Sequence, residues 1–146
     1  MKDKFFLGLS AGLAGSLVMA ALLWLLNLIP GVSIKMLYEI ASLFNVGAVG
    51  TFQRGITGTI VHFICGSIIG LAMLSLFQTT GYGLPMLKGA GMGAFTWFLL
   101  CGILARLLNL QMRDTFTDSM LLLLVHTAYG MTTGWFLARY RHTEMA

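Results

Sequence analysis

Two histidines lie inside long apolar stretches of this chain, where ionisable side chains are uncommon and usually have a function. Each begins the same pattern, in which glycines follow at the fourth and eighth positions: His62, Gly66 and Gly70, and then His126, Gly130 and Gly134. An imidazole ring can ligate a metal, carry a proton near neutral pH, or donate and accept hydrogen bonds. The pattern therefore makes His62 and His126 the candidate ligand-binding residues, and no catalytic residue is predicted.

Three roles fit a pair of histidines at matched depth. Each lies about seven residues into its stretch, roughly 10 Å along a helix that rises 1.5 Å per residue. His62 and His126 could be the axial ligands of one haem b, with the glycines leaving room for a flat porphyrin. They could instead form a proton relay, or hydrogen-bond neighbouring helices as polar contacts. The sequence leaves all three open and predicts no metal other than haem iron.

The histidines belong to two of four stretches that are apolar enough to span a bilayer, whose 30 Å core takes about 20 helical residues. The predicted spans are Phe5–Ile29, Ile56–Phe77, Leu87–Leu110 and Asp118–Ala138. Turn-prone or charged residues separate them. The sequence therefore predicts an all-α integral membrane four-helix bundle, a single membrane domain over residues 1–146.

A fifth, shorter helix is predicted between the first two spans. Ser33–Asn45 places Lys35 and Glu39 on one face and apolar residues on another, with Ser33 as the N-cap. The segment is too short to span. It is expected to lie in the membrane interface, or alternatively to pack over the end of the bundle.

Composition supports a membrane protein. The chain is 58% hydrophobic and 10% charged, against roughly 25% charged residues in soluble domains. Its nine Lys and Arg residues are scattered, so nucleic-acid binding is not expected. Their distribution favours both termini in the cytoplasm. Cys65 and Cys101 fall inside spans and form no redox or zinc motif, so they are expected to behave as small apolar residues.

Glycines at four-residue spacing mark the faces where helices approach closely. The predicted helix-packing residues are Gly8, Gly12, Gly15, Gly58, Gly66, Gly70, Gly89, Gly93, Gly130 and Gly134. The sequence does not decide whether these faces meet within one chain or between two copies.

The two halves of the chain resemble each other. The second and fourth spans share the histidine–glycine pattern, and the first and third end in similar segments around Asn27 and Asn109. Two tandem helical hairpins of parallel topology are predicted, so that the first span corresponds to the third and the second to the fourth.

Missing motifs exclude several functions. The span cores contain no Asp or Glu, which disfavours a proton-coupled exporter. The chain has no phosphate-binding Walker motif and no HExxH, so no enzymatic activity is expected.

The glycine-rich first span, the duplicated hairpin and the Leu87–Gly89 start of the third span are similar to small four-span membrane proteins of uncharacterised function from Gram-positive bacteria. The resemblance implies a bacterial cytoplasmic membrane and transfers no functional residue. We expect a non-enzymatic accessory subunit or self-associating scaffold, with a membrane protein partner or a second copy. The alternatives are a haem b electron carrier using His62 and His126, and a homo-oligomeric channel or transporter.

Overall fold

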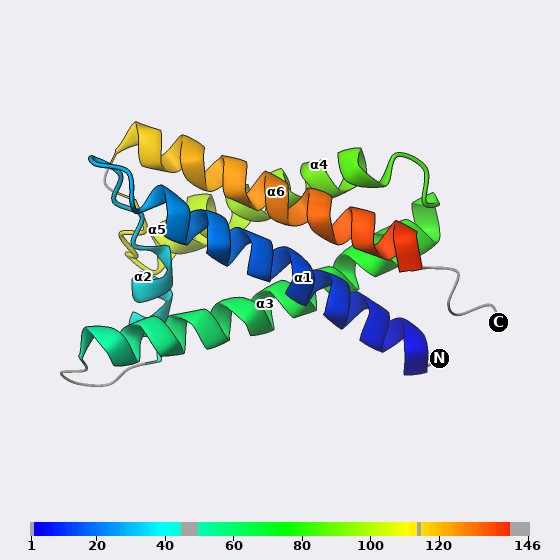
Figure 1. Cartoon of the computed structure of the whole chain (residues 1–146), viewed down its shortest axis with the longest axis horizontal. Coiled ribbons are helices and arrows are strands. Elements are labelled where there is room, and N and C mark those ends of the chain that lie inside the picture. The colour runs from blue at the N-terminus through cyan, green and yellow to red at the C-terminus, as the bar shows by residue number, and fades with distance from the viewer. Residues whose placement is uncertain (1, 45–49, 114, 141–146) are drawn as a thin grey trace.

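The computed structural model describes residues 2–44, 50–113 and 115–140, and this part of the chain is helical without a strand. Figure 1 shows long helices running side by side. They are α1 (Lys2–Leu26), α3 (Thr51–Thr80), α6 (Phe116–Tyr140) and a composite third helix made of α4 (Pro85–Trp97), the π-helix η1 (Phe98–Leu104) and α5 (Ala105–Leu107).

These four helices are each long and apolar enough to cross a membrane. The prediction of an all-α four-helix membrane bundle is therefore confirmed. The start of α1 and the end of α6 lie at the same end of the bundle, as four crossings require (Figure 1).

The helices pair as two hairpins. α1 packs against α3, α4 packs against α6, and the contact between α1 and α6 joins the pairs. α3 crosses α1 and diverges from α6 toward the end where α1 finishes (Figure 1). At that end α3 packs against the short helix α2 (Met36–Ser42).

At several of the predicted packing glycines, the backbones of two helices are in contact. A Cβ added at Gly130 would collide with the carbonyl oxygen of Gly89, and one at Gly12 with that of Gly66. Each of the other predicted packing glycines also faces an atom of another helix. The pairs are Gly8 with Leu71, Gly15 with Tyr129 and Thr133, Gly58 with Leu37, Gly66 with Ser16, Gly70 with Gly8 and Gly12, Gly89 with Gly130, Gly93 with His126, and Gly134 with Pro85. These faces meet within one chain.

Helix α2 is shorter than the predicted helix Ser33–Asn45, and the prediction that Ser33 is its N-cap is wrong. Helix α2 begins after Lys35. The residues before it bond outside the helix: the Ser33 N–H donates to Asp118 Oδ1 at 3.2 Å, and the Ile34 N–H donates to Asn27 Oδ1 at 2.9 Å. The predicted end at Asn45 lies outside the described residues.

Helix α2 packs on the bundle, which is the second of the two predicted placements. Gly58 of α3 touches the backbone of Leu37, and Met36 and Ala41 are buried. That α2 also meets lipid headgroups stays a prediction.

A capping box fixes the start of α6. Thr115 Oγ1 accepts the Asp118 N–H at 3.1 Å, and Asp118 Oδ2 accepts the Thr115 N–H at 3.0 Å. Because Asp118 also binds Ser33, its buried carboxylate ties α6 to the chain that leads into α2.

Candidate functional site

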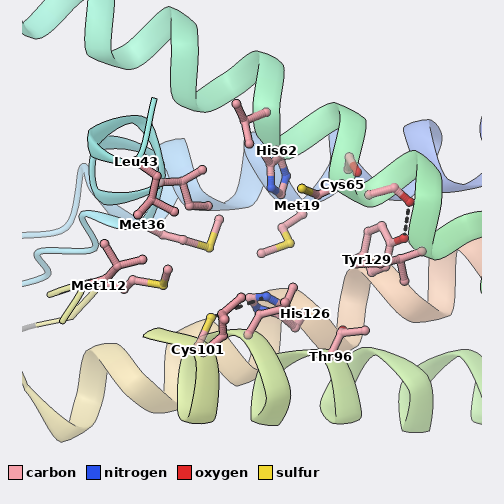
Figure 2. A pocket seen from close by; sticks show the side chains of 18 of the residues that line it. Met19, Met36, Leu43, His62, Cys65, Thr96, Cys101, Met112, His126 and Tyr129 are labelled. Carbon is pink, nitrogen blue, oxygen red and sulfur yellow. Dashed lines mark hydrogen bonds between the residues drawn. The ribbon is translucent and has the colours of Figure 1, made fainter. Parts of the chain in front are cut away.

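A cavity of about 180 Å³ lies where α3 diverges from the rest of the bundle. It is lined by residues of α1, α2, α3, the third helix and α6. Figure 2 shows His62 entering from α3 and His126 from the opposite wall. Both side chains are buried, with 8% and 5% of their surface exposed. The fold thus brings the two predicted histidines to one cavity.

The hydrogen bonds of His126 define its tautomer. Its Nδ1 lies 2.8 Å from the carbonyl oxygen of Leu122, one turn earlier on α6. A carbonyl only accepts, so Nδ1 carries the proton, and Nε2 of the neutral ring keeps its lone pair. That nitrogen lies 3.8 Å from Cys101 Sγ, whose S–H can donate to it.

His62 differs from His126 in its surroundings. Its ring lies near the backbone of Ser16 on α1. Its Nε2 is buried and has no hydrogen-bond partner. A buried polar atom without a partner is uncommon in folded proteins and calls for an explanation such as a bound group. The only other such side-chain atom in the described ranges, Trp97 Nε1, does not line the cavity.

The hydroxyl groups around the cavity are all used within the protein. Ser16 donates to Gly12 at 2.9 Å, Thr96 to Gly93 at 2.8 Å, and Tyr129 to Gly66 at 2.7 Å, in each case to a backbone oxygen. The imidazole atoms that face the cavity are therefore Nε2 of His62, which has no partner, and Nε2 of His126, which contacts the Cys101 thiol.

Most of the other side chains in the cavity lining that could bind a metal contain sulfur. Both cysteines of the chain and three methionines from separate parts of the fold line the cavity, as Figure 2 shows: Cys65, Cys101, Met19, Met36 and Met112. No sequence pattern groups these five residues. Only Cys65, which follows His62 by three positions on the same helix face, had a local signal.

The π-helix η1 places Cys101 opposite His126. A π turn adds one residue to a helix and is frequent at functional sites. The Cys101 carbonyl accepts a hydrogen bond from Arg113 Nη1 at 2.9 Å, so a side chain outside the helix satisfies this oxygen.

A haem is a poor fit to the cavity as it stands. Sites for drug-sized ligands measure roughly 300–1,000 Å³, whereas this cavity is about 180 Å³. Figure 2 shows the Met19 side chain between the two rings, in the place an iron would take. The haem ligation by His62 and His126 stays a prediction, and it requires Met19 to move.

The asparagines of the repeated segments lie elsewhere. Asn27 holds the turn after α1, because its side chain hydrogen-bonds the Leu23 carbonyl at 3.0 Å and both backbone groups of Ile34. Asn109 follows α5 with a positive φ of 54°, a conformation that asparagine tolerates well.

The fold and the cavity define a small four-helix membrane protein with an internal site of imidazole and sulfur groups. The chain belongs to a family described as "Family of unknown function (DUF6789)", whose model matches residues 2–146. No curated protein and no solved structure gives a significant match.

Proposed function

We propose that this protein is a non-enzymatic accessory membrane subunit that holds a small ligand in the cavity between His62 and His126. The observation that carries the proposal is the buried, unpartnered Nε2 of His62, which faces the same space as Nε2 of His126. Every hydroxyl nearby is satisfied by the protein. An unpartnered Nε2 on His62, facing a second Nε2 that meets only a weak thiol donor, suits a ligand that accepts electron density or donates hydrogen bonds.

Self-association through the glycine faces has less support. The predicted glycines contact neighbouring helices of the same chain, so a second copy or a partner would use other surfaces. We infer that these backbone contacts are the main determinant of the fold.

A channel also has less support. Beyond the cavity, toward the start of α1 and the end of α6, the bundle is filled by a closely packed group that we call the sealed half: Ala11, Met73, Leu74, Phe77 and Leu137. Of these, all but Leu74 have no exposed surface. An ion crossing the bilayer would have to displace them.

The glycine contacts of the two hairpins support internal duplication. In each hairpin the histidine–glycine helix lays its two glycines on small residues of the preceding helix: Gly66 and Gly70 face α1, and Gly130 and Gly134 face α4. Gly12 and Gly89 are counterparts in these contacts, because each meets the carbonyl oxygen of the glycine four residues after the histidine, Gly66 and Gly130.

We place the protein in a bacterial cytoplasmic membrane with both termini inside, as the Lys and Arg distribution favours. The shared end of α1 and α6 agrees with termini on one side (Figure 1).

A small aromatic probe tests the ligand-holding function. Indole carries one N–H donor for a free Nε2 atom, and ligand binding to the folded state raises its stability by about 2.7 kcal/mol at 100 times Kd. We expect indole to raise the unfolding temperature of the wild type in lipid nanodiscs, and benzene, which has no donor, to raise it less.

Two neighbouring leucines provide the matched variants. Leu100 lines the cavity, whereas Leu99 is exposed and does not line it. Leu100→Phe should abolish the indole effect and Leu99→Phe should keep it. Equal responses in both variants, or no response in the wild type, would contradict the proposed function.

A further inference from the structure

The cavity collects sulfur to an unusual degree for its size. The chain has two cysteines and both line it, together with Met19, Met36 and Met112. We propose, building on the ligand-holding function above, that the cavity binds one Cu(I) ion, with His126 and Cys101 as its primary ligands.

The distance between these two groups suits a shared metal. Typical metal bonds of about 2.0 Å to a histidine nitrogen and 2.3 Å to a cysteine sulfur, opened at a trigonal angle, separate the ligand atoms by about 3.7 Å. Nε2 of His126 and Sγ of Cys101 are 3.8 Å apart. An ion can enter between them with little movement of either helix.

A third ligand is available without rearranging the backbone. The Met19 side chain lies between the two rings in Figure 2, and Nε2 of His62 faces the same space. The described residues hold no group of three or more His, Cys, Asp or Glu arranged for a metal, so the third ligand would be the Met19 thioether, which completes a soft site.

Charge also selects a monovalent ion. When the S–Cu bond forms, Cys101 loses its proton to the solvent, and no electron is transferred. The thiolate and Cu(I) then sum to zero charge, which an apolar interior accepts far better than a net charge. No Asp or Glu lines the cavity, so a divalent ion held by one thiolate would leave a buried positive charge.

Anaerobic titration of the purified protein in nanodiscs with Cu(I), against the chelator bicinchoninate, tests the site. We expect one Cu(I) per chain and a loss of affinity of at least tenfold in Cys101→Ser and in His126→Ala. X-ray absorption of the copper should show both nitrogen and sulfur neighbours.

Methionine variants distinguish Cu(I) binding in the cavity from Cu(I) binding to any methionine of the chain. Met to Leu conserves volume and removes the thioether. Met19→Leu should weaken Cu(I) binding, whereas Met73→Leu, in the sealed half, should leave it unchanged. If His126→Ala fails to fold, Cys101→Ser and Met19→Leu still decide the question.

The outcomes distinguish the two proposals. Binding of Cu(I) that is equal in wild type and Cys101→Ser, or copper without sulfur neighbours, overturns the metal site. A protein that responds to indole and does not bind Cu(I) keeps the proposed function and loses this inference. A protein that responds to neither loses both.

Discussion

The sealed half and the cavity half of this bundle use different residues for different purposes. Glycine contacts run along both halves, and in the sealed half apolar side chains fill the centre. Around the cavity, α3 diverges from α6, and imidazole and sulfur groups line the space that remains. The buried residues of the sealed half come from α1, α3 and α6, whereas α2 and the third helix also line the cavity.

The difference separates stability from binding. Without a hydrophobic driving force between helices in lipid, close packing and interhelical hydrogen bonds hold a membrane bundle together. The glycine contacts and the sealed half supply that packing, so the cavity can keep polar atoms unpartnered. Substitutions in the two halves should therefore have different effects.

The largest effect is expected where backbones touch. A Cβ at Gly130 collides with the Gly89 carbonyl, whereas Gly91 has open space around it. Gly130→Ala should lower the free energy of unfolding by at least about 3 kcal/mol, because neither backbone can yield easily. Gly91→Ala should change it by less than about 1 kcal/mol, in the stabilising direction. Unfolding in SDS measures both, and equal effects would contradict the close approach of α4 and α6.

A smaller effect is expected from truncating methionine in each half. Met73 and Met36 are both buried, at 0% and 3% exposure, but only Met36 borders the cavity. Met73→Ala should cost about 2.5 kcal/mol, because it opens a void in a filled core. Met36→Ala should cost less than half as much, since its side chain already faces empty space. The same unfolding measurement decides, and a larger cost at Met36 would mean that the cavity is filled.

The smallest effect is expected at the end of the cavity where α6 begins. Asp118→Ala removes the acceptors for Ser33 and Thr115 and should cost about 1–2 kcal/mol. Thr117→Ala changes an exposed residue of the same turn; it is the control and should be nearly neutral. Because the lost bonds hold the segment before α2, hydrogen exchange at Ser33 and Ile34 should rise in Asp118→Ala alone.

The spans, the glycine faces and the histidine pair could be predicted because each rests on a local pattern. Hydropathy over 20 residues identifies a span, and a four-residue period identifies a helix face. His62 and His126 followed from the same repeated pattern, and the structure brings them to one cavity. The Thr115–Asp118 capping box also had a local signal, a threonine followed three residues later by an acid before an apolar run.

The rest of the site could not be predicted, because it depends on how the helices diverge. Met19, Met36, Met112 and Cys101 come from four separate segments that only the tertiary fold brings together. The π-helix that presents Cys101 has no signature in an apolar run of seven residues. The predicted helix Ser33–Asn45 is longer than α2. Its first residues bond elsewhere, because the Ser33 and Ile34 N–H groups donate to Asp118 and Asn27, which are distant in the sequence or lie in another element.

The most direct test of the cavity is the nitrogen-15 NMR spectrum of labelled histidine side chains, in a His142→Gln background that leaves only His62 and His126. The two Nε2 atoms should be unprotonated, and the signals of both should move together when indole is added, because both face one cavity. The same spectrum of Leu100→Phe should not respond. A protonated Nε2 on either ring, or a response from only one histidine, would contradict the shared site.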